Sequence, residues 1–150
     1  MLKCFEAEET EILCRRIDAM DAQSLPLWGK MNASQMIKHC TVPYNQIFDS
    51  NAPKAPLLMR ILVRLFFKKS MIDNTPYKQN LPTAPNFIIH ETPEIESCKE
   101  ILKAKIRETQ NLGAQYFEGR KHSTLGKLTA LEWNNVLYKH IDHHLNQFGK

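Results

Sequence analysis

The chain is 150 residues long, enough to build one hydrophobic core and not two, so we expect a single domain over residues 1–150. Hydrophobic residues make up 43% of the chain and charged residues 24%, which excludes global disorder and a low-complexity protein. The net charge is +4, with one dense basic cluster at residues 60–69, and this modest excess argues against a dedicated nucleic-acid binder.

The start of the chain and its hydropathy predict where the protein is found. Residues 1–9 contain no apolar stretch of the kind that a signal peptide carries. No segment reaches the roughly 18 apolar residues of a membrane-spanning helix. We therefore expect a cytoplasmic protein with no membrane span. Its cysteines show no paired spacing and are expected to be free thiols, largely in the core: Cys4, Cys14, Cys40 and Cys98.

Apolar residues recur at helical spacing along most of the chain, which predicts an all-α fold. The first helix is expected over about residues 5–21. The second begins after Asn32, an N-cap residue with Gln35 three positions later, as in a capping box. Pro43 falls inside this helix, where it removes a backbone donor and predicts a kink.

The middle of the chain departs from this regular pattern. Residues 57–67 predict a short apolar helix, which we expect to pack over one end of the core. Two alternatives remain for this segment: a helix that lies on a membrane surface, or a docking surface for a partner or for the second copy in a homodimer. Residues 73–93 hold four prolines and predict a long loop.

Two further long helices complete the predicted fold. Thr92 and Pro93 are expected to open the third, as its N-cap and first helical residue. Thr129 and Glu132 form a capping-box pattern at the start of the last helix, which should end at about Gln147. Together these elements predict a four-helix bundle, with a short extra helix and a proline-rich loop between its second and third helices.

Three of the six histidines fall within residues 139–144 of the last helix. On a helical wheel His140 and His144 lie about 40° apart on the apolar side, so both rings point toward the core. Their Cβ atoms are then about 5–6 Å apart, which lets both rings reach one ion. His143 falls at the rim of this face and is not expected to be a ligand, and Asp142 is expected to face solvent.

The second helix supplies a candidate third ligand. His39 lies on its apolar-leaning face, and a facing helix in a bundle can bring it opposite the pair on the last helix. Three neutral imidazoles with one open position are the ligand set of a catalytic zinc site. The alternative is that the histidines are core residues satisfied by carbonyls or water, because a His-x-x-x-His pair alone is a weak pattern.

Two pairs of segments carry a family resemblance: WGKM at 28–31 with SQMIKH at 34–39, and GKLTALEW at 126–133 with YKHIDHHLNQFG at 138–149. They resemble the second and last helices of the DinB-like superfamily, in particular an uncharacterised bacterial branch described as a domain of unknown function. The resemblance covers the whole chain, although residues 50–95 match loosely. It implies a four-helix bundle with a metal site formed by His39, His140 and His144.

The resemblance also implies a class of activity. Members of the superfamily include thiol-dependent S-transferases and isomerases that use bacillithiol, mycothiol or glutathione, and others resemble metal-dependent hydrolases. The implied function is thus a metal-dependent transferase or hydrolase that acts on a small-molecule substrate. Its cofactor would be a divalent metal, zinc or nickel first, and its co-substrate a low-molecular-weight thiol.

The residues themselves leave the reaction open. No inward-facing carboxylate stands out as a general base, which favours a thiol or water activated by the metal. Three imidazoles also suit copper or iron, so the pattern does not select the ion. The alternative function is a non-catalytic metal-binding or partner-binding helical protein. The expected pocket residues are Trp28, Gln35, Tyr44, Trp133 and Gln147.

Overall fold

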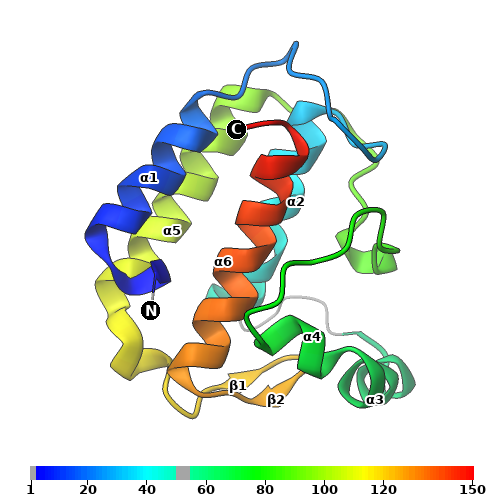
Figure 1. Ribbon diagram of the computed structural model, residues 1–150, viewed down its shortest axis with the longest axis vertical. Helices are drawn as coiled ribbons and strands as arrows, with labels where there is room; N and C mark the ends of the chain where they lie inside the picture. Colours follow the sequence, from blue (N-terminus) through cyan, green and yellow to red (C-terminus); the bar gives the residue numbers. More distant parts are fainter. Residues whose placement is uncertain (1–2, 50–54) are drawn as a thin grey trace.

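The computed structural model describes residues 3–49 and 55–150. In these residues the chain is mostly helical, as predicted, with six α-helices, two short 3-10 turns and one small antiparallel hairpin. The elements in chain order are the turn Lys3–Phe5, α1 (Ala7–Asp18), α2 (Ala33–Phe48), α3 (Leu57–Phe66), α4 (Lys68–Ile72), the turn Pro85–Phe87, α5 (Ile95–Phe117), β1 (Lys121–His122), β2 (Gly126–Lys127) and α6 (Ala130–Gln147) (Figure 1).

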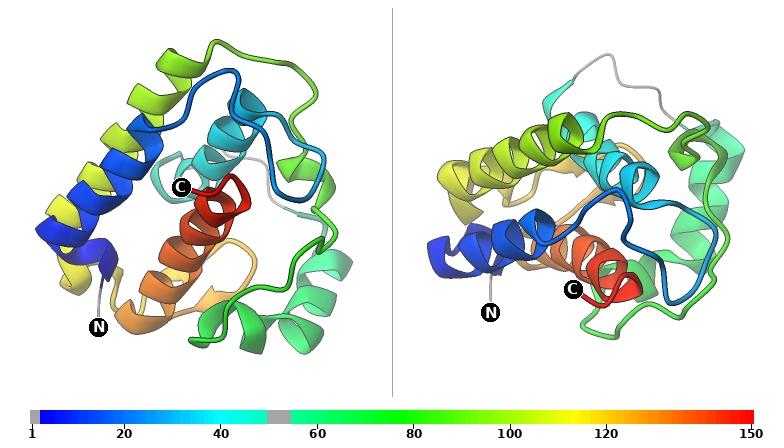
Figure 2. Two further views of the ribbon diagram at one scale, coloured as in Figure 1. Left: turned by 45° about the horizontal axis from the view of Figure 1, so that its top comes forward. Right: turned by 90° about the horizontal axis from the view of Figure 1, so that it is seen from above.

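The four longest helices pack against one another around the core. α5 contacts α1 and α2, and α6 contacts α1, α2 and α5. The segment from α3 to the turn Pro85–Phe87 lies on the opposite side of α6 from α1 (Figures 1 and 2). Fully or nearly fully buried apolar side chains fill the space between the long helices: Leu13, Ile17, Met36, Ile37, Leu102, Ile106, Leu137 and Ile141.

Local side-chain chemistry fixes the starts of α2 and α6. The Asn32 side chain accepts a hydrogen bond from the Gln35 backbone N–H, and the Gln35 side chain accepts one from the Asn32 N–H. Thr129 and Glu132 make the same reciprocal pair before α6. Both predicted capping boxes are confirmed. α2 continues through Pro43 to Phe48 as one helix, so the proline does not break it.

The start of α5 differs from the prediction. Its N-cap is Glu94, whose carboxylate accepts hydrogen bonds from the backbone N–H groups of Glu96 and Ser97. The Thr92 hydroxyl instead accepts a hydrogen bond from the Asn32 side chain. The Glu94 carboxylate accepts both hydrogen bonds and also places a negative charge at the positive end of the helix dipole. The Thr92 hydroxyl has no charge, so it would stabilise the helix start less.

The segment between α2 and α5 is where the fold departs furthest from expectation. The predicted apolar stretch, residues 57–67, forms α3 and its C-cap Phe67, and a second short helix, α4, follows it directly. Every residue of α3 is described and none is buried, so the expected packing over the core is wrong except at Val63, which is partly buried against it. The predicted proline-rich loop is confirmed, since residues 73–94 contain only the short turn Pro85–Phe87.

The hairpin between α5 and α6 was not predicted. Its strands pair Lys121 with Lys127, and the turn between them is held by the imidazole of His122. The His122 Nδ1 accepts hydrogen bonds from the backbone N–H groups of Thr124 and Leu125, at 3.0 and 3.2 Å. A ring nitrogen that accepts hydrogen bonds carries no proton, so this turn depends on neutral His122.

Acidification is therefore expected to destabilise the protein through His122. Burial, with the nearby Arg64 as a second cause, lowers the pKa of this imidazole to about 4. The unfolded chain titrates near 6.5 and binds more protons than the folded chain between these values, so the free energy of unfolding falls as the pH falls. We expect His122 to contribute a loss of roughly 2 kcal/mol between pH 7 and pH 5.

Urea unfolding at the two pH values, with a chelator present, measures this loss. In His122→Asn the amide oxygen can replace Nδ1 as acceptor without titrating. The variant should therefore lose less stability on acidification than the wild type. The same loss in both proteins would show that other groups carry the pH dependence.

Candidate metal centre

The structure brings the three predicted histidines together between α2 and α6. His39 comes from α2, and His140 and His144 lie one turn apart on α6. One ring nitrogen from each lies within 4.8 Å of the others, and the Nε2 atoms of His39 and His140 are 3.0 Å apart. Two nitrogens that each lie 2.0–2.1 Å from a tetrahedral ion are about 3.3 Å apart, so this spacing fits a shared ion.

Hydrogen bonds on the far side of the rings orient two of the three imidazoles. The Nδ1 of His39 lies 2.9 Å from the Phe87 carbonyl oxygen, and the Nδ1 of His144 lies 2.8 Å from Oε1 of Gln147. The Gln147 amide nitrogen donates to the Trp28 carbonyl, which fixes the direction of this amide. Since both Nδ1 atoms face oxygen acceptors, they carry the protons, and each Nε2 keeps a free lone pair.

His140 is the ring whose nitrogens the protein leaves least satisfied. Its Nδ1 is buried and has no hydrogen-bond partner among the described residues. Its Nε2 faces the Nε2 of His39, which carries a lone pair and no proton because the His39 proton is on Nδ1. The centroid of the His144 ring lies 4.8 Å from the centroid of the His140 ring. A proton on His140 could serve only one neighbouring lone pair at a time, whereas a cation would satisfy all three.

Burial keeps the three imidazoles in the form that binds metals. Desolvation is the main cause that lowers the pKa of His144 to about 3 and the pKa values of His39 and His140 below their usual 6.5. The neighbouring rings lower the pKa values of His140 and His144 further. At neutral pH all three rings are therefore neutral, and a neutral imidazole needs to lose no proton before it binds an ion.

The long loop covers the histidines on one side. The Phe87 ring lies against His39 and His140, with centroids 5.7 and 6.4 Å away. The Gln35 side chain donates a hydrogen bond to the carbonyl of Ile89, 3.2 Å away. Gln35, predicted as a pocket residue, is thus an anchor for the loop segment that places Phe87, and it is not within the histidine group.

Two predicted pocket residues lie in the core, away from the histidines. Trp133 packs against Phe117 and His122 near the hairpin, about 10 Å along α6 from His140 because seven residues separate them. Tyr44 is 1% exposed and follows His39 by five residues, so it points about 140° away around α2. Trp133 thus shares the His140 face of α6 but lies two turns away, whereas Tyr44 lies on another face of α2, and the structure brings neither residue to the histidines.

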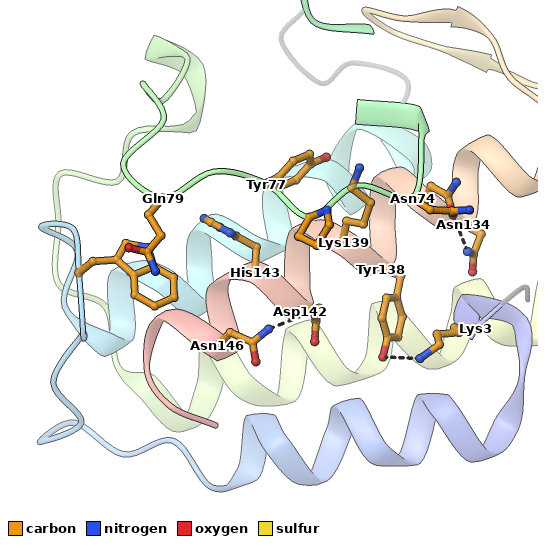
Figure 3. A pocket seen from close by; sticks show the side chains of 13 residues that line it. Lys3, Asn74, Tyr77, Gln79, Asn134, Tyr138, Lys139, Asp142, His143 and Asn146 are labelled. Atoms are coloured by element: carbon orange, nitrogen blue, oxygen red, sulfur yellow. Dashed lines mark hydrogen bonds between the residues drawn. The ribbon is translucent and has the colours of Figure 1, made fainter. Parts of the chain in front are cut away.

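A pocket of about 450 Å³ opens beside the histidines (Figure 3). His143 lines it, with its ring 5.9 Å from Trp28 and 5.8 Å from Tyr77, and does not belong to the metal-ligand group. Its ring centroid is 5.1 Å from that of His144, so His143 stands between pocket and cluster. The other lining residues are largely polar: Lys3, Asn74, Pro76, Gln79, Asn134, Asn135, Tyr138, Lys139, Asp142 and Asn146.

The Asp142 side chain is 36% exposed, so it faces solvent in part, as expected, but its carboxylate is also paired. Its carboxylate accepts hydrogen bonds from Arg16, at 2.7 Å, and from the Asn146 side chain, at 3.0 Å. The ion pair ties α6 to α1. With its two oxygens so engaged, Asp142 is better placed to hold the helices together than to take part in the histidine cluster.

The cysteines stay apart from the cluster. All four are free and buried, as predicted, and none belongs to the candidate ligand group in the described part of the chain. Burial raises the pKa of the Cys4 and Cys40 thiols, so both are protonated at neutral pH. The candidate centre therefore offers nitrogen ligands and no thiolate.

One family model matches the chain over residues 4–150, and it describes a protein of unknown function, DUF1569. The chain belongs to the DUF1569 family. No curated protein and no solved structure matches the sequence. The match confirms that the chain is a member of an uncharacterised family, and it includes all three clustered histidines of this DUF1569 protein. Among the described residues, no helix has the length and apolar character needed to cross a bilayer.

Gly29 is expected to be required for the orientation of His144 in the DUF1569 protein. Its φ is +85°, and a Cβ at this position would collide with Nε2 of Gln147. Gly29→Ala should push Gln147 away from His144 and weaken metal binding by about tenfold. This is the lower end of the range of affinity losses that follow when the hydrogen-bond partner of a metal ligand is removed.

Gly119→Ala is the matched control, since Gly119 has a φ of +70° and no described atom within 4 Å of the added Cβ. Both variants carry similar backbone strain, and only the first touches the site. Competition with a chromophoric chelator measures both affinities. An equal loss in the two variants would contradict a specific role for Gly29.

Proposed function

We propose that this DUF1569 protein is a metal-dependent enzyme whose divalent ion, zinc or nickel, is held by His39, His140 and His144. The observation that carries the proposal is the convergence of three neutral imidazoles, two of them oriented by Nδ1 hydrogen bonds to oxygen. Three protein ligands leave a position open, as in catalytic zinc sites, whereas structural sites are closed by a fourth. When bound, the ion would supply a Lewis acid and lower the pKa of a water or thiol in that position.

The fold supports the same proposal through the resemblance to the DinB-like superfamily. We infer that α1, α2, α5 and α6 form the four-helix bundle of that superfamily, because each of these helices packs on at least two of the others. Bundles build metal sites from side chains on facing helices, and here the ligands come from α2 and α6. The pairing of a single histidine on one helix with His-x-x-x-His on another agrees with the pattern that the resemblance implies.

The surrounding residues have roles in binding and orientation. Phe87 excludes water from the side of His39 and His140 on which it packs. Gln147 holds the proton of His144 on Nδ1. We place the small-molecule substrate in the pocket that His143 lines. The amide, hydroxyl and ammonium groups of the other lining residues favour a polar substrate. A low-molecular-weight thiol is the first candidate for co-substrate, and water, in a hydrolase, is the second.

A turnover assay tests the catalytic part of the proposal. The protein is stripped with a chelator, reloaded with zinc or nickel, and incubated with an electrophilic aryl halide and glutathione, bacillithiol or mycothiol, and separately with an activated ester. We expect turnover in the loaded protein and none in the stripped protein or in His140→Ala. His90→Ala is the control, because His90 is exposed and outside the cluster. Stoichiometric metal without turnover of any substrate would favour the non-catalytic metal-binding function instead.

A further inference from the structure

Helix α3 turns its apolar face away from the protein. The side chains of Leu57, Leu58, Leu65 and Phe66 are 68–71% exposed, an unusual exposure for four large apolar residues on one helix. Ile61 and Leu62 lie between them and are about 40% exposed. At 100° per residue these six side chains share one half of the helix, so they form one continuous apolar face.

The opposite side of α3 attaches the helix to the protein. The Arg64 guanidinium donates a 2.6 Å hydrogen bond to the Thr124 carbonyl in the hairpin turn, and Val63 packs against the core. In Figure 1 α3 accordingly lies beside β2, at the end of the molecule where the hairpin is. A helix at a protein surface normally buries its apolar side. In α3 the side that carries Arg64 contacts the protein, and the apolar side is exposed to solvent. The apolar face is therefore fixed in position but not covered by the described residues.

All charged residues of α3 and α4 are basic. The sequence has no acidic residue between Asp49 and Asp73, and the two helices carry four basic ones: Arg60, Arg64, Lys68 and Lys69. The hairpin beneath α3 adds Lys121 and Lys127, both exposed. Two copies of the protein joined through α3 would bring two such basic sets together, and like charges at close range oppose that contact. An anionic surface would instead be attracted to the same residues.

We propose that α3 attaches this protein to the surface of an anionic lipid bilayer. Its outward leucines, isoleucine and phenylalanine enter the boundary between headgroups and acyl chains, and the lysines of α4 and of the hairpin meet the lipid phosphates, while Arg64 stays bonded to the hairpin turn. Ten residues of helix measure about 15 Å, which suits a helix lying in the membrane plane and is half of what crossing requires. This attachment is independent of the metal centre, which lies between α2 and α6.

Co-sedimentation with two kinds of vesicle tests the proposal: phosphatidylcholine alone, and phosphatidylcholine with about one third phosphatidylglycerol. The wild type should bind the anionic vesicles more tightly, and added salt should weaken the binding. The double variant L65E/F66E should lose about tenfold or more in affinity. The matched control, I101E/L131E, makes the same charge change at exposed apolar positions on α5 and α6 and should bind like the wild type.

A second pair of substitutions separates charge from apolar insertion. Lys68→Gln and Lys69→Gln should each reduce binding to the anionic vesicles by about fivefold, without affecting the melting temperature. Wild type that stays in the supernatant with both vesicles would overturn the proposal, as would equal losses in L65E/F66E and I101E/L131E. A wild-type dimer that L65E/F66E converts to a monomer, without vesicle binding, would assign the face to self-association instead.

Discussion

Replacing His140 with alanine is expected to reduce metal affinity by more than about 100-fold, since a direct ligand is lost and not a supporting hydrogen bond. His140 lies at the centre of the cluster, with its Nε2 3.0 Å from that of His39 and its ring 4.8 Å from that of His144. Without it, the two remaining imidazoles come from different helices and offer only two ligands. Elemental analysis after dialysis against a weak chelator measures the loss.

His143→Ala is the matched control for this prediction. His143 lies on the same helix one residue from His144, yet it lines the neighbouring pocket and is not part of the ligand group. It should retain nearly wild-type metal content. Similar losses in His140→Ala and His143→Ala would show that the ion binds at the pocket rim and not between α2 and α6.

Removal of the ion is expected to lower the melting temperature by about 5–10 °C. An ion at 100 times its dissociation constant stabilises the folded state by about 2.7 kcal/mol when the unfolded chain does not bind it, and each kcal/mol corresponds to about 2–4 °C in a chain of this size. His39 and His140 are 101 residues apart, so the ion joins distant parts of the chain. Thermal unfolding at neutral pH, with zinc and with a chelator, measures the shift.

His140→Ala provides the control for this thermal shift. With its ligand set broken, the variant should melt at the same temperature with and without zinc. A shift as large as in the wild type would mean that the ion stabilises the protein through other groups, the buried cysteines among them.

The features that the sequence predicted correctly depend on residues close together in the chain. The two capping boxes need only the residue at the N-cap and the residue three positions later, and both formed as expected. The approach of His140 to His144 follows from the helical repeat alone. The placement of His39 opposite these two residues depends on the packing of α2 against α6. The family resemblance implied this packing, whereas the helical periodicity was only compatible with it.

The features that were missed depend on contacts between distant segments. The acceptor for His39 is the carbonyl of Phe87, and no side-chain pattern identifies a backbone carbonyl in a loop. The amide of Gln147 reaches both His144 and the Trp28 carbonyl, 119 residues away from it in sequence. For α3 the sequence predicted a helix packed over the core, but the exposure of its large apolar side chains and the bond from Arg64 to the hairpin show that its apolar face points outward.

X-ray absorption at the metal edge, on protein loaded with one equivalent of zinc or nickel, tests the three-histidine centre most directly. A site at His39, His140 and His144 predicts, for zinc, three imidazole nitrogens at about 2.0–2.1 Å, one further light ligand, and no sulfur near 2.3 Å. For either metal, the imidazole signal should be lost in His140→Ala. A sulfur shell, or a wild-type spectrum in His140→Ala, would contradict the assignment and place the ion elsewhere in the protein.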